Sequence, residues 1–144
     1  MPLHPGYYFI FSGPRQVGRH PIEDRSLRPK RVLALPPGVR PLGPWLVQPA
    51  GPERYKLRAL GAPTAEDNGL LWAYLMDEDQ DFDWAINSKG DDYYTVEKRG
   101  TVGWVATSGE EGPWGTQIAV RHFNPDGEGH LFKFIRADRS EIAE

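Results

Sequence analysis

Apolar residues in this chain come in short runs, many with apolar and polar positions alternating, and Gly, Pro, Asn and Asp separate the runs. No stretch of ten or more residues shows a clean 3.6-residue apolar period, so the pattern does not favour amphipathic helices. Short alternating runs between turn-forming residues are typical of a β-sandwich or a β-barrel. We expect strands within residues 7–11, 31–35, 45–47, 55–59, 70–75, 84–86, 93–96, 102–106, 116–122 and 131–135.

Pairs of apolar residues two positions apart recur at fixed distances. Trp45 is followed by apolar residues at offsets of 2, 10 and 12, and Trp84 by apolar residues at the same offsets. Because side chains alternate along a strand, each pair marks the buried face of one strand. The two sets are Trp45, Val47, Tyr55, Leu57 and Trp84, Ile86, Tyr94, Val96. The pattern extends to both ends of the chain through Tyr8, Ile10, Phe132 and Phe134.

This repetition predicts a single domain made of three copies of a four-strand unit, approximately 4–50, 51–89 and 90–144. Three such copies around an aromatic and aliphatic core describe an all-β protein with the β-trefoil fold. In that fold six strands close a barrel and three hairpins cap one end. The twelve residues of the apolar pairs are the predicted core. A β-sandwich with accidental periodicity is the alternative.

Composition narrows the range of functions. The formal net charge of −3 gives no basic signal, so neither nucleic acid nor an anionic membrane is an expected partner. The absence of cysteine excludes disulfides, a thiol nucleophile and a cysteine-based metal site. The N-terminus has no charged region followed by an apolar run, and no run reaches the roughly 18 apolar residues of a membrane span. We expect a monomeric cytoplasmic protein, with secretion of a processed chain as the alternative.

Two prolines, Pro21 and Pro29, bracket a polar segment in the N-terminal third. Trypsin-like proteases cut after Arg, because its guanidinium pairs bidentately with a carboxylate in a deep pocket. A segment that resembles a substrate but is stiffened at both ends suits a substrate-like inhibitor, whereas the simpler interpretation is a solvated connection between two strands. The bracketed residues are Ile22, Glu23, Asp24, Arg25, Ser26, Leu27 and Arg28.

The N-terminal third also resembles a known family. Residues 6–10, 17–30, Val32 and 35–36 are similar to the cospin-type serine protease inhibitors of mushrooms. The resemblance implies a cysteine-free β-trefoil that is not an enzyme and whose partner is a trypsin-like serine protease. Members of the family use different loops for the reactive site. The last long loop, 123–130, serves a relative through a basic residue but contains no Lys or Arg here, so that site does not carry over.

Simple chemistry selects the bond that a protease would meet. Arg28 and Arg40 precede proline, which lacks an N–H and restricts the residue before it. Eight other basic residues lie in expected strands, in tight turns or with little loop around them: Arg15, Arg19, Arg31, Arg54, Arg58, Lys98, Arg99 and Arg121. Arg15 and Arg54 remain possible sites, and the Arg25–Ser26 bond, in the expected connection between the second and third strands, is the preferred one.

In this scheme Arg25 fills the primary pocket of the protease, Ser26 follows the scissile bond and Leu27 packs beyond it. Pro21 and Pro29 lower the entropy of the free loop. Glu23 and Asp24 have two open roles: hydrogen bonding within the loop, or repulsion of the wrong proteases.

A second reactive site is an alternative. Asn68 lies next to Gly69 in a predicted loop, 61–68, between the fifth and sixth strands. The mycocypins, related mushroom trefoils, use an asparagine in that loop, and this similarity implies a site for asparaginyl endopeptidase or other cysteine proteases. Asn-Gly is also an ordinary turn dipeptide.

A carbohydrate-binding trefoil is an alternative from another class, since Trp72, Trp104 or Trp114 would stack on a sugar ring if exposed. The repeated Gln-x-Trp of ricin-type lectins is absent. The acidic run 77–83 lacks the glycine and the final glutamate of a calcium loop, so we expect a solvated turn. The histidines show no metal-ligand spacing, and no catalytic set is present, so no metal, cofactor or enzymatic activity is expected.

Overall fold

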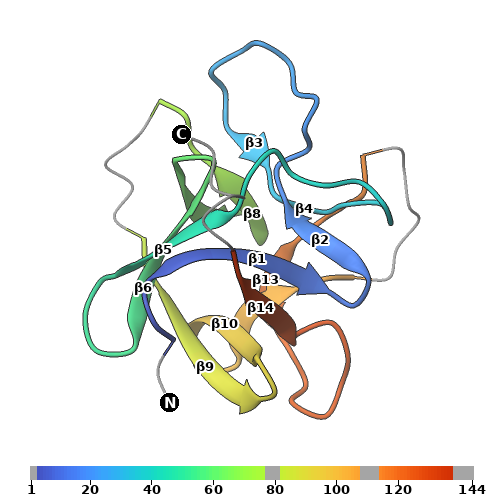
Figure 1. The fold of residues 1–144 in the computed structure, drawn as a ribbon. Coiled ribbons are helices and arrows are strands. Elements are labelled where there is room, and N and C mark those ends of the chain that lie inside the picture. Colours follow the sequence, from blue (N-terminus) through green and yellow to red (C-terminus); the bar gives the residue numbers. More distant parts are fainter. Residues whose placement is uncertain (1–2, 77–81, 108–113, 138–144) are drawn as a thin grey trace.

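The structure is a computed structural model that describes residues 3–76, 82–107 and 114–137. In this part of the chain no helix is long and apolar enough to cross a membrane. The described residues form fourteen strands (Figure 1): β1 (Gly6–Ser12), β2 (Arg15–Gly18), β3 (Lys30–Arg31), β4 (Leu33–Ala34), β5 (Trp45–Pro49), β6 (Arg54–Ala59), β7 (Ala62–Asp67), β8 (Leu70–Ala73), β9 (Trp84–Gly90), β10 (Tyr93–Arg99), β11 (Val102–Val105), β12 (Thr116–Gln117), β13 (Ala119–His122) and β14 (Phe132–Arg136).

Six of the described strands close a barrel. β1 pairs with β5, β5 with β6, β6 with β9, β9 with β10, β10 with β14, and β14 with β1, always antiparallel. A closed ring leaves no unpaired strand edge in the barrel. The N-terminal strand is therefore held on both sides by strands that come much later in the chain.

Three hairpins complete the fold. β2 pairs with β4, β7 with β8, and β11 with β13. Short contacts join the hairpins to one another, because β8 also pairs with β3 and β13, and β4 pairs with β12. A six-stranded barrel with three hairpins is the β-trefoil fold, so the predicted fold class is confirmed.

The barrel core contains the residues that the apolar repeat predicted. Eleven of the twelve are buried, and Tyr94 is half-buried against the same cluster. Trp104 lies between Trp45 and Trp84, with ring-centroid distances of 5.4 and 5.7 Å. Each fully buried apolar side chain contributes about 1.5–3 kcal/mol, and no disulfide supplements this burial.

The structure corrects one element of the sequence-based expectation. Residues 61–68, predicted as a loop, consist mainly of strand β7. The buried positions of β7 include the small residues Ala62 and Ala65, so the large apolar residues that mark the other strands are missing here. The connection that remains between β7 and β8 is a tight turn of two residues, Asn68 and Gly69.

Candidate functional site

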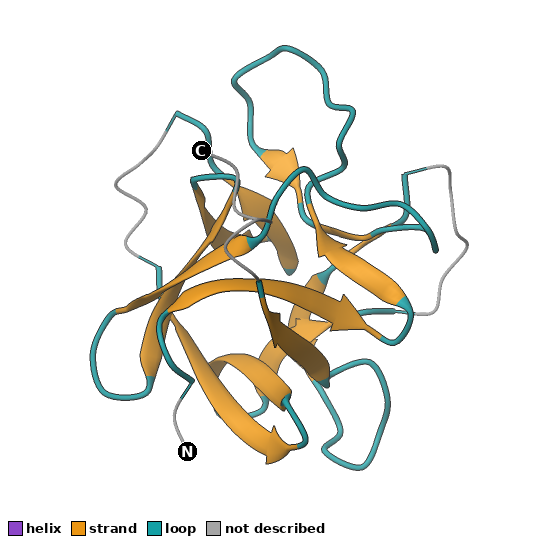
Figure 2. Cartoon of the chain, viewed as in Figure 1, coloured by secondary structure: helices purple, strands orange, loops and turns teal. Residues whose placement is uncertain are grey.

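The connection between β2 and β3, residues 19–29, contains neither helix nor strand and projects from the body of the protein (Figures 1 and 2). Arg25 is exposed near its centre, and its side chain makes no hydrogen bond or ion pair with the described part of the chain. Ile22 and Leu27 are exposed as well, with 68% and 59% of their surfaces accessible. The loop therefore offers solvent a free guanidinium between two apolar side chains.

The first half of the loop is anchored through Arg19. This residue was expected in a strand, but β2 ends at Gly18 and the Arg19 side chain instead lies buried at the base of the loop. Its Nε and Nη2 donate to the two carboxylate oxygens of Glu23 at 3.0 and 2.6 Å. Its Nη1 donates to the carbonyl of Ala59, the last residue of β6, at 3.1 Å. Glu23 is thus fixed to the barrel through one arginine.

The centre of the loop is organised around the Asp24 carboxylate. Oδ1 of Asp24 accepts from the backbone N–H of Ser26 at 2.9 Å, from the Ser26 hydroxyl at 2.5 Å and from Nζ of Lys30 at 2.5 Å. The Lys30 ammonium, and after it the Ser26 groups, hold the pKa of Asp24 well below its usual range. Glu23 and Asp24 both bond within the loop, which is one of the two roles left open by the sequence.

The second half of the loop returns to the body at Lys30. The Lys30 side chain is buried, and its backbone pairs with Ala73 of β8. Between Ser26 and β3, the backbone N–H of Arg28 donates to Ser26 Oγ at 3.4 Å, while the Arg28 side chain and Pro29 are exposed. At the other end, Pro21 is half-buried. The two prolines occupy the ends of the segment, and the fixed φ of proline restricts the backbone there.

His20 supports the start of the loop from a third direction. The backbone N–H of Ile22 donates to His20 Nδ1 at 3.0 Å. The imidazole packs edge-on against the ring of Trp114, with centroids 4.6 Å apart. This contact ties the loop to the segment that precedes β12.

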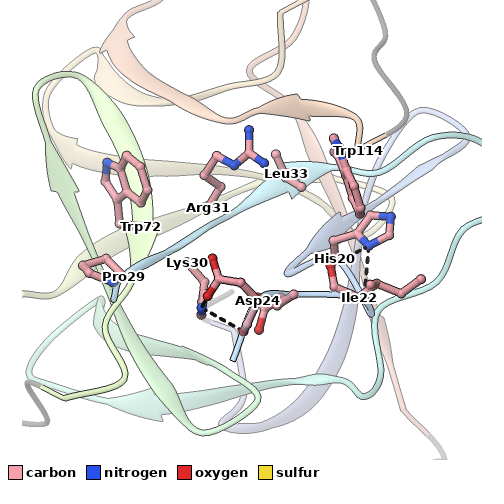
Figure 3. Close-up of a pocket in the computed structure, with 10 residues that line it drawn as sticks. His20, Ile22, Asp24, Pro29, Lys30, Arg31, Leu33, Trp72 and Trp114 are labelled. Carbon is pink, nitrogen blue, oxygen red and sulfur yellow. Dashed lines mark hydrogen bonds and ion pairs between the residues drawn. The ribbon is translucent and has the colours of Figure 1, made fainter. Parts of the chain in front are cut away.

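A hollow of about 600 Å³ opens beside the loop. Figure 3 shows Trp72 and Trp114 on opposite sides of it, with Arg31 between them. Asp24, Ile22 and the buried Lys30 contribute to the wall nearest the loop. The hollow thus lies between residues of the projecting loop and Trp72 of β8, and Arg25 is not among the residues that line it.

The alternative site at Asn68 has a different geometry. Asn68 and Gly69 have φ values of 52° and 77°, both left-handed, as a two-residue hairpin turn requires. The Gly69 N–H donates to Glu66 Oε2 at 3.1 Å, and Glu66 also pairs with Lys98 at 2.7 Å. A tight turn held in this way does not present an extended, substrate-like segment around Asn68.

The tryptophans considered for sugar stacking fall into two groups. Trp104 is fully buried, so its expectation as an exposed platform is wrong. Trp72 is half-buried and Trp114 is 41% exposed, and both face the hollow beside the loop.

Among the described residues no group of three or more His, Asp or Glu is arranged to hold a metal ion. Residues 77–81 of the acidic run lie outside the described part of the chain.

Sequence reasoning missed two residues that position the loop, Arg19 and Lys30. Arg19 was assigned to a strand, and Lys30 entered only as part of a family motif. A signal for the first was present, because a basic residue four positions before Glu23 suits an ion pair across a short bend. The contact of Lys30 with Asp24 depends on the path of the whole loop and has no comparable signal.

Comparisons with known proteins find relatives of this chain. The profile of the family described as Peptidase inhibitor I66 matches residues 1–134. A serine protease inhibitor of Lentinula edodes is 35% identical over 107 residues, which are 72% of this chain and 75% of that protein. The structure of a proteinase inhibitor from Coprinopsis cinerea superimposes with a TM-score of 0.80 at 30% identity, covering 94% of this chain and 99% of the other.

More distant structures share the fold alone. The designed three-fold symmetric protein ThreeFoil has a TM-score of 0.67 at 15% identity, covering 92% of this chain and 99% of its own. A Polyporus squamosus lectin has a TM-score of 0.65 at 19% identity, covering 92% of this chain and 49% of the lectin.

Proposed function

This chain belongs to the peptidase inhibitor I66 family, the cospin-type fungal serine protease inhibitors, and on that premise we propose that it inhibits trypsin-like serine proteases through the Arg25–Ser26 bond. It is an inhibitor and not an enzyme. The bond lies in the projecting loop between β2 and β3.

One observation carries this choice of bond: Arg25 is free, while the residues on both sides of it are held. Glu23 is bound to the buried Arg19, and Asp24 and Ser26 are bound to the buried Lys30. A protease pocket can therefore take the guanidinium without breaking any contact that holds the loop. The ordering cost of binding falls mainly on a single side chain.

The proposed complex follows the ordinary geometry of a substrate in a protease cleft. The Arg25 guanidinium pairs with the carboxylate at the base of the primary pocket. Ser26 follows the scissile bond, and the exposed Leu27 and Ile22 bury their apolar surface against the protease on either side. Backbone groups of the segment add to a strand edge of the enzyme. Such interfaces bury about 1,600 Å² in total and reach very high affinities.

A trypsin inhibition assay on the wild type and three variants tests the proposal. Arg25→Ala should raise the inhibition constant by roughly a hundred-fold or more, because the pocket carboxylate loses its charged partner. Arg25→Lys should retain inhibition, since an ammonium also pairs with that carboxylate. Arg40→Ala is the matched control, because Arg40 is likewise exposed but lies on the neighbouring loop before a proline.

Equal inhibition by wild type and Arg25→Ala would show that another loop carries the activity. Absence of inhibition by the wild type against a panel of trypsin-like proteases would reject the trypsin-directed function.

A further inference from the structure

The Asp24 carboxylate and the Lys30 ammonium bind the groups on both sides of Arg25. From this arrangement, and resting on the proposed function, we infer that Asp24 and Lys30 form a clamp that keeps the two ends of a cut Arg25–Ser26 bond together. The clamp favours remaking the bond over its hydrolysis, and it makes these two residues positioning residues of the inhibitor.

The first arm of the clamp holds the leaving group. When a protease cuts after Arg25, the nitrogen that leaves is that of Ser26. In the intact loop this nitrogen donates its hydrogen to Asp24 Oδ1 at 2.9 Å, and the Ser26 hydroxyl donates to the same oxygen at 2.5 Å. Ser26 is thus tied by two bonds to a residue on the other side of the scissile bond.

The second arm holds the acyl side. Nζ of Lys30 donates to the backbone carbonyl of Asp24 at 3.2 Å and to Oδ1 of the same residue at 2.5 Å. It also lies 3.2 Å from Ser26 Oγ, which accepts from it. One ammonium therefore reaches the residue before Arg25 and the residue after it. Figure 3 shows Lys30 and Asp24 facing each other beside the hollow.

The base of the clamp is rigid. Lys30 is only 6% exposed and begins β3, where it pairs with Ala73 of β8. Ala73 in turn pairs with the buried Thr64 of β7. The backbone that carries the buried Lys30 side chain is consequently fixed to the hairpin β7–β8, which a cut in the loop does not touch.

The chemistry of the cut explains why this matters. The serine oxygen of the protease bonds to the Arg25 carbonyl carbon, and the bond from that carbon to the Ser26 nitrogen breaks. The nitrogen takes the proton that the protease histidine had received from the serine, so the products are an ester and a neutral amine. Asp24 can accept one hydrogen of this amine and leave its lone pair directed at the ester carbon.

The reverse step then needs no diffusion. The amine attacks the ester carbon, the carbon–nitrogen bond reforms, and the serine oxygen leaves and regains its proton through the histidine. No water is consumed. In an ordinary substrate the amine departs and water attacks the ester instead. Holding the amine in place converts its attack into an intramolecular reaction, which raises its effective concentration strongly.

The test compares net cleavage and resynthesis in trypsin. Asp24→Asn keeps the shape of the side chain and removes its charge, and Lys30→Met removes the ammonium. Cleavage at Arg25–Ser26, followed by mass spectrometry, should be roughly ten-fold faster or more in both variants than in the wild type. Chain cut at this bond and incubated with catalytic trypsin should return to intact protein for the wild type but not for Asp24→Asn.

Two further variants separate a clamp from a structural role. Lys30→Arg keeps a cation in the same place and should retain most of the resynthesis. Asp126→Asn makes the same chemical change on an exposed side chain of another loop and should behave as the wild type.

If Asp24→Asn is cut no faster and is resynthesised as well as the wild type, the clamp is rejected, even if the variant melts at a lower temperature. In that case wild-type inhibition and the effect of Arg25→Ala still support the proposed function. If the wild type neither inhibits trypsin nor is cut at Arg25–Ser26, the proposed function fails and the clamp fails with it.

Discussion

Arg19 and Glu23 form a two-point ion pair at the base of the projecting loop, with N–O distances of 3.0 and 2.6 Å. The buried guanidinium donates a third hydrogen bond to the carbonyl of Ala59 in β6. Glu23, four residues after the buried Arg19, is therefore fixed relative to the barrel.

Replacing Glu23 should weaken both the fold and the inhibition. Glu23→Ala leaves a buried guanidinium with one acceptor, and we expect a loss of about 2–3 kcal/mol in the free energy of unfolding in urea. The inhibition constant for trypsin should rise at least ten-fold, because the loop loses an anchor. Glu128→Ala, at an exposed glutamate of another loop, is the control and should change neither quantity. An unchanged inhibition constant for Glu23→Ala would show that this anchor does not matter for binding.

The Asp24 carboxyl should remain ionised in acid. Its pKa in the folded protein lies below the ordinary 3.8, mainly because of Lys30. Because the pKa is lowered, ionised Asp24 contributes its full stabilisation of the folded protein above pH 3.8. This contribution is lost only as the pH falls through the pKa of Asp24 in the folded protein. A carboxyl NMR titration should place the midpoint of Asp24 below 3.8, and Lys30→Met should move it upwards. A wild-type midpoint at or above 3.8 would contradict the ion pair.

Two tryptophans should respond very differently to truncation. Trp104 is fully buried between the rings of Trp45 and Trp84, so Trp104→Ala should lower the free energy of unfolding by about 3–5 kcal/mol. Trp114 is 41% exposed, and Trp114→Ala should cost less than about 1 kcal/mol. Urea unfolding followed by circular dichroism measures both. Similar losses for the two variants would contradict the difference in burial between Trp104 and Trp114.

We expect Asn68 to stabilise the turn between β7 and β8 and to have no role in the inhibition of trypsin. Its φ of 52° is unfavourable for most residues, so Asn68→Ala should destabilise the protein by about 1 kcal/mol. Asn68→Gly tolerates the same backbone and is the matched control. Neither variant should alter the inhibition constant for trypsin. A large rise in that constant for both variants would instead place this turn in the protease interface.

The sequence predicted the barrel because its strands carry large apolar residues two positions apart, as in Trp45 with Val47. Strand β7 was not predicted because its buried residues include Ala62 and Ala65, which are too small to mark a strand in the apolar pattern. Trp104 lies outside the two sets of fixed offsets, so the repeat did not mark it as a core residue. Long-range contacts decided these cases, and a linear pattern does not contain them.

The loop itself was located by its prolines and by Arg25, but the bonds inside it were not. The contact between Asp24 and Lys30 forms because the chain folds back on itself over six residues. Local composition indicates that such a turn is possible. The path of the backbone determines which side chains come within hydrogen-bonding distance of each other. The family resemblance pointed to the same segment through the spacing of its motif, without showing which of its residues bond to one another.

The pairing of strand β1 determines what happens to the protein after the loop is cut. β1 is one of the six barrel strands and pairs with β14 on one side and β5 on the other, and its Ile10 is buried in the core. Scission after Arg25 would yield a short peptide containing β1 and β2 and a long remainder containing β5 and β14, the barrel partners of β1. The two pieces would stay assembled as a non-covalent heterodimer, so the fold performs the tethering that a cystine bridge provides in other small proteins.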